Sequence, residues 1–585
     1  MKTRTVLRRL TMAKSGSAPT FYGRTKLLAR LTVFMSATLA IGVQAVEVDA
    51  GLLQQQMERS QPLKLPLMIS PKSDKLPIAE SSKTGPLVTL KQFRFTGNSK
   101  LSSQMLSTVV SQYLGKSLSF SQLEAVLIDV SEAYREAGWV VRVFLPEQDI
   151  VNGIVDIQII EATFGEVIVK EKLPGVATSE VLKKIINARQ ESSQLLSSQA
   201  IDRALLIAGD ISGALVTGSL QEGQVEGQTD LLLKLLGKPL LQGGITTDNT
   251  GAVSTGASRI LVNLGVNNFL AAGDTLSTQL MSTTGTKYIR IGNSMPIGVY
   301  GLRVGVNASK LNYNVLQLAA ELDAKGSSDT LGLEASYPLI RSRLQNLSVN
   351  FSVDGKNFKN LSAGEVSSEY KNKIISLGLS GNSFDSLGGG GANSANLTLF
   401  QGKLNLDGSP NAEEVAFTTQ TNGLYRKLRY TLIRQQEVTN QLSLYAALSG
   451  QLANKNLDSS EKFYLGGSSG VRAYPSSEGG GASGTALNLE LRWQVASGYS
   501  WVGFFDAGHV TVNRSNNFSS APAVNDFVIK GAGVAINWQV KNGLELKAIW
   551  ARRIGNNPNA DLITGSDQDG SLVKNRFWAS ANLLF

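Results

Sequence analysis

The sequence predicts two tandem β-α-α-β-β modules of the α+β class followed by a transmembrane antiparallel β-barrel, of about 16 strands at roughly 20–24 residues per strand and connection. Three observations predict this fold. The chain begins with a cationic and then apolar segment, its next part repeats one order of strands and helices, and its last 345 residues show long strand alternation. Glycine rises from 17 in the first 240 residues to 41 in that last part.

Composition argues against most catalytic and metal chemistry. The chain has no cysteine and a single histidine, His509, which excludes disulfides, thiolate nucleophiles and sites built on two imidazoles. The motif Gly115-Lys116-Ser117 lacks the leading glycine of a phosphate-binding loop, because that position is Val110. We therefore expect no catalytic residue, no metal, no cofactor and no nucleotide site, and we expect that the protein is not an enzyme.

The net charge of +10 is concentrated at the start of the chain. Eight of the 56 cations precede residue 46, where no Asp or Glu occurs, and the remaining 48 cations face 46 anions. Such a balance lacks the positive surface that phosphate backbones require, so nucleic acid is not an expected partner. The apolar run Leu31–Val43 is too short to span a bilayer as a helix, and small residues allow cleavage after Ala45. Residues 1–45 are predicted to be an extended signal peptide, with an uncleaved anchor as the alternative.

A short helix and a long linker are predicted next. Asp49 can cap a helix within residues 46–59, on which Leu52, Leu53 and Met57 form an apolar stripe. Five of the 15 prolines then fall within 25 residues, which removes backbone donors and prevents helix formation. Residues 60–86 are therefore predicted to be an extended tether for the helix.

Residues 87–162 and 163–238 show the same order of elements. The first module is predicted to contain a strand at 88–95, two helices, and strands at 140–145 and 154–160. Its second helix is predicted to begin with a capping box of Ser121 and Glu124 and to end before Gly138. The second module is predicted to have a strand at 166–170, a helix from Thr178, a helix at 198–208 closed by Gly209, and strands at 214–220 and 230–235.

Residues 239–585 alternate between apolar and polar side chains over segments of seven to nine residues. One such segment has Leu487, Leu489, Leu491, Trp493 and Val495 on one face. This length and pattern fit tilted strands that cross a hydrocarbon layer in a closed barrel, with the polar residues facing inwards. A soluble β-sandwich also alternates but is rarely this large, and a β-helix would show a short fixed repeat.

Several motifs resemble one family of proteins. Phe463–Pro475, with Val471-Arg472-Ala473-Tyr474, resembles the sixth-loop segment of two-partner secretion transporters, whose motif is Val-Arg-Gly-Tyr, and Phe504–Gly508 resembles their Phe-x-Asp-x-Gly strand motif. The modules resemble polypeptide-transport-associated (POTRA) domains at Phe95–Asn98, Leu145–Gln148, Asn152–Gly153 and Gly209–Gly213. Asp248-Asn249 and Thr255-Gly256 resemble the opening of the family's barrel. The resemblance covers the mature chain in order, so it is identified as a member of the haemolysin secretion/activation (TpsB) family.

The resemblance implies where the functional residues lie. An isolated guanidinium inside a barrel would be costly, and the family implies that Arg472 meets Asp506, which fixes the loop tip in the pore. The implied sites are a pore-loop motif (Val471, Arg472, Ala473, Tyr474), a barrel-wall motif (Phe504, Asp506, Gly508) and a plug helix (Leu52, Leu53, Met57). Ala473 replaces the family's glycine, and it would be strained if that position required a positive φ.

The resemblance also implies the function. It predicts a protein-translocation pore in the outer membrane of a Gram-negative bacterium, with its POTRA domains in the periplasm. An unfolded exoprotein of the TpsA type, an adhesin or haemolysin, would add to POTRA edge strands, whose residues are unassigned, and be exported to the cell surface. The expected partners are this secreted exoprotein and outer-membrane lipid. The alternatives are a barrel-assembly factor of the same superfamily and a plain diffusion porin.

Overall fold

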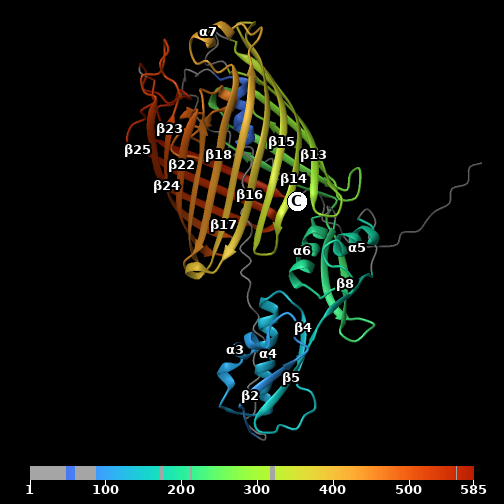
Figure 1. Cartoon of the computed structure of the whole chain (residues 1–585). Coiled ribbons are helices and arrows are strands. Elements are labelled where there is room, and N and C mark those ends of the chain that lie inside the picture. Colours follow the sequence, from blue (N-terminus) through green and yellow to red (C-terminus); the bar gives the residue numbers. More distant parts are fainter. Residues whose placement is uncertain (1–47, 60–86, 171–176, 211–213, 317–322, 562) are drawn as a thin grey trace, which may run out of the picture. The chain divides into compact units, whose positions relative to one another are not determined.

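A computed structural model of the chain describes residues 48–59, 87–170, 177–210, 214–316, 323–561 and 563–585. The predicted signal peptide (1–45), the predicted tether (60–86) and residues 211–213 of the Gly209–Gly213 motif lie outside the described residues. Figure 1 shows two α/β modules, labelled by β2–β5 and by α5, α6 and β8, and a large β-barrel. None of the helices within the described ranges is both long and apolar enough to cross a membrane.

The first module has the predicted order of elements. They are β1 (Val88–Thr89), β2 (Gln92–Thr96), α3 (Ser103–Val109), a 3₁₀ turn (Ser111–Tyr113), β3 (Ser117–Leu118), α4 (Phe120–Glu136), β4 (Val141–Phe144) and β5 (Ile154–Glu161). The main sheet has the order β2-β5-β4, with β2 parallel and β4 antiparallel to β5. The strand predicted at 88–95 is two strands, because β1 pairs with β3 and only β2 joins the main sheet. Both helices bury apolar side chains such as Leu106 and Tyr134 against β5.

The predicted capping box of α4 is wrong by two residues. The cap is Ser119, whose backbone N–H donates to Oε1 of Gln122 at 2.8 Å. The sequence contains the capping pattern twice, as Ser119-x-x-Gln122 and Ser121-x-x-Glu124, and glutamine closes the box as well as glutamate. Because β3 ends at Leu118, the helix begins at Phe120 and Ser121 already lies inside it. The predicted end is confirmed, since Gly138 follows the helix with a φ of 85°.

Glu161 joins three elements of the first module. Its carboxylate accepts hydrogen bonds from the backbone N–H groups of Ser99 and Lys100, both at 2.7 Å, and from Tyr134 Oη of α4 at 2.9 Å. Burial alone would raise the pKa of Glu161, but the hydrogen bonds from Ser99, Lys100 and Tyr134 outweigh it and lower the pKa below its usual value. The same turn needs Gly97, whose φ is 83° and at which an added Cβ would lie 2.1 Å from the Ile159 carbonyl oxygen.

The second module repeats the arrangement. It contains β6 (Thr163–Val169), α5 (Ser179–Asn187), α6 (Ser198–Gly209), β7 (Ala214–Glu222) and β8 (Gln228–Gly237), with the sheet order β6-β8-β7. The helix predicted from Thr178 begins at Ser179, and the Thr178 side chain is its cap. Gly209 is the last residue of α6, so the cap is Asp210. Phe164, Ile186 and Leu233 are fully buried between the helices and the sheet, so this module has a core of its own.

The barrel closes with 16 antiparallel strands, as predicted (Figure 1). The strands are β9 (Leu241–Asp248), β10 (Arg259–Asn267), β11 (Thr275–Ser282), β12 (Thr286–Ile297), β13 (Leu302–Asn314), β14 (Lys325–Arg341), β15 (Gln345–Ser362), β16 (Glu365–Asp385), β17 (Gly391–Asn405), β18 (Gly423–Glu437), β19 (Leu442–Ala453), β22 (Ser483–Ala496), β23 (Tyr499–Thr511), β24 (Asp526–Val540), β25 (Leu544–Ile554) and β26 (Asn575–Leu584). The last strand pairs with the first, for example Leu583 with Ile245, so no edge is left open.

The alternating side chains point where the sequence predicts. On β22, Leu491 and Trp493 are 47% and 51% exposed, whereas Ala486 of the same strand, whose side chain lies on the other face, is 3% exposed. Polar side chains of the inner face bond across strands, as Asn350 does to Ser380 at 2.8 Å. An apolar outer face and a hydrogen-bonded polar lumen are the two surfaces that a transmembrane barrel requires.

We predict that Glu161→Gln destabilises the first module in a pH-dependent way. Because the folded-state pKa is lowered, the carboxylate stabilises the fold fully above its unfolded pKa of about 4.3, and this contribution is lost as the pH falls through the folded-state pKa. The free energy of unfolding of the soluble segment 87–238 should fall by about 1–2 kcal/mol at pH 7, and the difference from wild type should shrink below about pH 4.

Urea unfolding of the segment at the two pH values measures both effects. Glu132→Gln is the control, because Glu132 forms an exposed ion pair with Arg135 on the same helix and should change stability little. A loss from Glu161→Gln that is the same at both pH values would contradict the proposed role of the carboxylate.

Candidate functional site: a loop and a helix inside the barrel

The connection between β19 and β22 folds into the barrel. It spans residues 454–482 and contains a 3₁₀ turn (Ser459–Glu461) and two short paired strands, β20 (Phe463–Tyr464) and β21 (Gly480–Gly481). Leu465, Val471, Ala473 and Tyr474 of this loop are fully buried. They pack against inward-facing residues of the wall, including Phe504 of β23 and Trp578 of β26. The loop is therefore a lumen-filling element.

Arg472 and Asp506 meet at the tip of this loop. Nε and Nη2 of Arg472 donate to the two carboxylate oxygens of Asp506 at 2.9 and 2.8 Å, and the backbone N–H of Arg472 donates to the same carboxylate at 3.0 Å. The third guanidinium nitrogen, Nη1, donates to Oε1 of Glu490 at 2.7 Å. Asp506 is fully buried and Arg472 is 4% exposed, so each charge depends on the other.

The wall shapes the space for this pair. Asp506 lies on the same inward face of β23 as Phe504 and Gly508. The Phe504 ring lies 3.6 Å beneath the guanidinium, a cation–π contact that covers the face not used for hydrogen bonds. An added Cβ at Gly508 would lie 2.7 Å from Cδ2 of Leu465, so this glycine leaves room for the loop to approach the strand. Together, Phe504, Asp506 and Gly508 form the receptacle of the loop tip.

Ala473 fits without backbone strain. The φ of Ala473 is not positive, so the backbone strain that a positive φ would cause at this position does not arise. Room for its methyl group is provided by Gly531 of β24, which pairs with Asp506 of β23 and at which an added Cβ would lie 2.6 Å from the Ala473 Cβ. The Ala473–Gly531 contact thus accommodates the departure from the family motif.

Other residues that hold the loop were not predicted from the sequence. Asn488 of β22 donates to Oδ1 of Asp506 at 2.7 Å, and Trp578 Nε1 donates to the Arg472 carbonyl oxygen at 2.8 Å. The Arg553 guanidinium lies 4.4 Å from the centre of the Tyr474 ring. Glu478 accepts from Asn559 Nδ2 at 2.9 Å, which ties the loop to the connection between β25 and β26. These partners are far apart in sequence. Only the inward direction of the strand residues among them could have been predicted from the alternation.

Helix α2 (Ala50–Arg59) packs against the inner face of the barrel. Leu52, Leu53 and Met57, the predicted apolar stripe, are each less than 8% exposed. Leu53 and Met57 belong to one buried cluster with Tyr288, Leu311, Phe358 and Tyr370, all on barrel strands. The backbone N–H of Ala50 donates to Oδ1 of Asn360 on β15 at 2.9 Å. The helix is therefore held by side chains of the wall, with no strand pairing.

The helix also contacts the loop directly. Ser459 Oγ donates to the carboxylate of Asp49 at 2.8 Å, and Gln55 Nε2 donates to the Lys462 carbonyl oxygen at 3.0 Å. An added Cβ at Gly51 would lie 2.6 Å from Ser459 Oγ, so the backbones approach as closely as glycine permits. Helix α2 and the loop thus form one packed unit in the lumen.

Lys356 connects the helix, the loop and the wall. From β15, its Nζ lies 2.6 Å from Oε1 of Glu58 on α2 and 3.8 Å from Oε1 of Glu461 in the loop. Glu461 forms its shortest ion pair with Lys427 of β18, which is 1% exposed. Lys356 and Glu461 are 7% and 4% exposed, so each depends on an opposite charge, whereas Glu58 is 29% exposed. No local pattern predicts this cluster, since its members lie up to several hundred residues apart.

We predict that Gly531→Ala undocks the loop and that adding Ala473→Gly restores docking. The new methyl group at position 531 would overlap that of Ala473, and removing the latter relieves the overlap. Because the chain has no cysteine, a single Val471→Cys reporter measures docking. Its maleimide labelling should be about tenfold faster with Gly531→Ala and return towards the parent rate in the double variant.

Gly503→Ala serves as the matched control. Nothing lies within 4 Å of an added Cβ at Gly503 on the neighbouring strand, so its labelling rate should equal that of the parent. If Ala473→Gly fails to rescue Gly531→Ala, steric contact between these two positions does not govern docking of the loop.

Comparisons with known proteins agree on one family. Residues 227–538 match the family described as haemolysin secretion/activation protein ShlB/FhaC/HecB, and residues 88–162 match the POTRA domain of the ShlB type. The heme/hemopexin transporter protein HuxB of Haemophilus influenzae is 26% identical over 95% of this chain and 99% of its own length. The outer membrane transporter CdiB of Dickeya dadantii is 23% identical over 79% of this chain and 82% of its own.

Solved structures share the fold. CdiB from Escherichia coli matches with a TM-score of 0.63 at 19% identity, covering 94% of this chain and all of that one. BamA from Haemophilus ducreyi lacking POTRA domains 1–3 matches with a TM-score of 0.51 at 14% identity, covering 85% of this chain and all of that one. The family match alone spans more than half of the 585 residues. The chain therefore belongs to the ShlB/FhaC/HecB family of haemolysin secretion/activation proteins, the outer-membrane transporters of two-partner secretion.

Proposed function

We propose that this protein exports one large exoprotein of the adhesin or haemolysin type through its barrel lumen to the cell surface. The observation that carries the proposal is the way the lumen is filled. Both α2 and the loop 454–482 occupy it through side-chain contacts, with the barrel ladder itself complete without them. Helix α2, which no strand pairing holds, can leave while the wall stays closed, which a protein-conducting pore requires.

Recognition of the substrate is assigned to the edges of the two POTRA sheets. In the order β2-β5-β4 the outer strands are β2 and β4, and in β6-β8-β7 they are β6 and β7. Edge strands present backbone N–H and C=O groups that pair with an extended chain whatever its sequence. An unfolded exoprotein is such a chain, so edge pairing would collect it in the periplasm before it enters the pore.

Helix α2 is assigned the role of a removable plug. Its polar contacts are single side-chain hydrogen bonds and ion pairs, such as Glu58 with Lys356 and Asp49 with Ser459. The helix lacks strand pairing that would have to be broken on exit. Its departure would widen the lumen and expose the pore loop to the incoming chain.

The loop tip is assigned the role of a fixed anchor. The Arg472–Asp506 pair is bidentate, buried and backed by Glu490 and Asn488, so breaking it would leave an uncompensated charge at a cost of about 3–5 kcal/mol. The plug rests on the part of the loop near Ser459–Glu461, which is distant in sequence from this tip. The plug can therefore move while the tip stays docked. Since no nucleotide site is predicted, folding of the substrate outside the cell would give export its direction.

We predict that a disulfide between Asp49→Cys and Ser459→Cys blocks export. The Asp49 carboxylate and Ser459 Oγ lie 2.8 Å apart, so the two side chains already meet, and the chain has no other cysteine. Surface delivery of a co-expressed exoprotein should fall at least about tenfold under oxidising conditions and recover with reductant.

Pore conductance of the purified protein in planar bilayers should rise after deletion of residues 46–59.

Each single cysteine variant is the control and should deliver exoprotein under both conditions. Full delivery by the oxidised double variant, once cross-linking is verified by mass spectrometry, would contradict the plug role of α2. Unchanged conductance after deletion of residues 46–59 would contradict it independently.

We predict that Arg472→Ala abolishes surface delivery at equal outer-membrane levels. Loss of the guanidinium leaves the Asp506 carboxylate buried without its cation, so the loop tip should undock. Surface exoprotein is measured by protease accessibility on whole cells, and barrel folding by heat-modifiable electrophoretic mobility. Unimpaired delivery would show that the pair is dispensable for transport. If the parent protein delivers no exoprotein, and other barrels assemble poorly in cells that lack it, the result would instead favour an assembly factor.

A further inference from the structure

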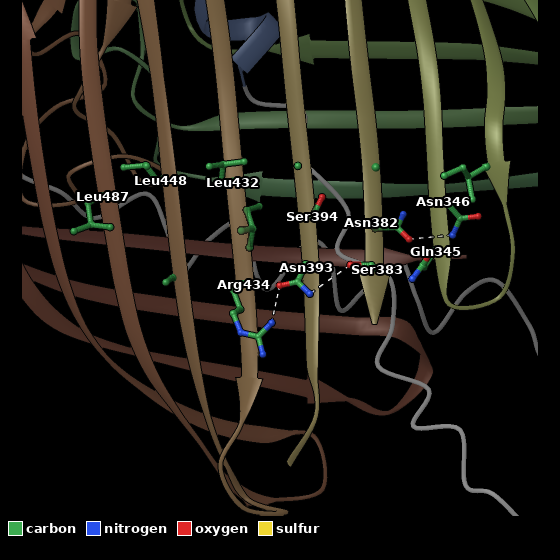
Figure 2. Close-up of a pocket in the computed structure, with 15 residues that line it drawn as sticks. Gln345, Asn346, Asn382, Ser383, Asn393, Ser394, Leu432, Arg434, Leu448 and Leu487 are labelled. Carbon is green, nitrogen blue, oxygen red and sulfur yellow. Dashed lines mark hydrogen bonds between the residues drawn. The ribbon is translucent and has the colours of Figure 1, made fainter. Parts of the chain in front are cut away.

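The outer face of the barrel carries a groove of about 680 Å³ over strands β14–β19 and β22. Figure 2 shows its lining, with Leu432, Leu448 and Leu487 on three neighbouring strands and a polar group around Asn393 and Arg434 below them. The register places these residues on the outward side. Leu432 is 50% exposed, whereas its neighbour Ile433 is 8% exposed, so the Leu432 side of β18 faces outwards and includes Arg434.

Small residues make the groove concave. Gly381 of β16 pairs with Ala395 of β17, and Ala395 pairs with Leu432 of β18. The same cross-strand row continues to Leu448 and Leu487. Above it, bulky outward residues such as Leu379 and Leu397 continue the apolar wall. The result is an apolar channel whose floor is formed by a glycine and an alanine, with leucines at its side.

The next row towards the strand ends is polar. Arg434 donates to both carboxylate oxygens of Asp385, at 2.8 and 3.2 Å, and to Asn393 Oδ1 at 2.7 Å. The two charged side chains remain 32% and 34% exposed. Gly391, opposite them, has no room for a Cβ, which would lie 2.6 Å from Arg434 Nη2. A mutually neutralised pair of charges thus lies beside outward residues, such as Leu432 and Leu448, that are apolar.

This polar row lies at the periplasmic end of the barrel. The chain enters the barrel from the POTRA domains at the start of β9, and successive strands alternate in direction. Because β16 is the eighth strand and β18 the tenth, both run towards the periplasm, and Asp385 is the last residue of β16. Charged residues are costly in the hydrocarbon but inexpensive near the interface, so the pair marks the level of lipid head groups.

We propose that this groove binds one phospholipid of the periplasmic leaflet whose zwitterionic head group carries a phosphate and a primary amine. The phosphate lies against the Arg434 guanidinium, the ammonium group lies against the Asp385 carboxylate, and an acyl chain follows the floor at Gly381 and Ala395. Charge complementarity selects this occupant, because the protein offers one cation and one anion side by side. An anionic lipid without the amine would leave its negative charge facing Asp385.

Native mass spectrometry of the intact, detergent-solubilised protein tests the proposal. Titration with phosphatidylethanolamine should give one saturable adduct per chain. Arg434→Gln, which removes the cation, and Ala395→Phe, which fills the floor, should each raise the apparent Kd at least about tenfold. Phosphatidylglycerol, an anionic lipid without an amine, should bind the parent protein at least about fivefold more weakly than phosphatidylethanolamine, and Asp385→Asn should remove this preference.

The Lys310–Asp329 pair provides the matched control. This pair also faces outwards, because Lys310 lies on the same face of β13 as the exposed residues Val304 and Val306. It lies, however, near the end of the barrel opposite to the periplasmic end. Lys310→Gln should bind phosphatidylethanolamine as the parent does. Heat-modifiable mobility verifies that every variant is folded, and no exoprotein is needed, so the result is independent of the proposed transport function.

Two results would overturn the proposal. One is an unchanged apparent Kd in folded Arg434→Gln and Ala395→Phe, which would show that lipid binds elsewhere on the barrel. The other is equal affinity for the two lipids, which would show that the Arg434–Asp385 pair does not recognise a zwitterion. A stronger affinity for phosphatidylglycerol would have the same meaning as equal affinity.

Discussion

The buried ion pair between Arg472 and Asp506 is the contact on which the interior of the barrel depends. Three hydrogen bonds join the two residues, and both are almost fully removed from solvent. In such surroundings a single unpaired charge costs several kcal/mol, so the loop has one docked position that satisfies both groups. The wall accommodates this position with Gly508 and Gly531, where any side chain would overlap the loop.

The docked loop then provides part of the surface on which helix α2 rests. Asp49, Gly51 and Gln55 of the helix and its flank contact Ser459 and Lys462 of the loop. The Lys356 side chain lies between carboxylates of both elements, Glu58 and Glu461. Release of the helix would leave Lys356 with the loop carboxylate alone. This gives a physical reason why the two lumen elements differ: one is anchored by a buried bidentate pair, the other by contacts that can be exchanged.

The outside of the barrel follows a different constraint. Lipid tails form no hydrogen bonds, so the strands close on themselves, and outward side chains such as Leu377, Leu397 and Leu432 are apolar. The Arg434–Asp385 pair departs from that rule at the periplasmic strand ends, beside a floor of small residues. A charged pair next to an apolar channel matches the two parts of a phospholipid, and both features come from adjacent rows of the same five strands.

The amino-acid sequence alone determined the class of fold and the side of each strand. Alternation has a period of two, which is local, so the outward position of Leu491 and the inward position of Asp506 follow from neighbouring residues. Local signals were ambiguous where one pattern occurs twice, as for the cap of α4 at Ser119, and the Arg472–Asp506 pairing came from family resemblance. Only the tertiary structure decided which inward residues meet: Lys356 with Glu58 and Glu461, and Ala473 with Gly531. The physical reason is that the position of a residue in the alternation determines whether its side chain points inwards or outwards. Which residue it then contacts depends on strand register, barrel closure and loop conformation together.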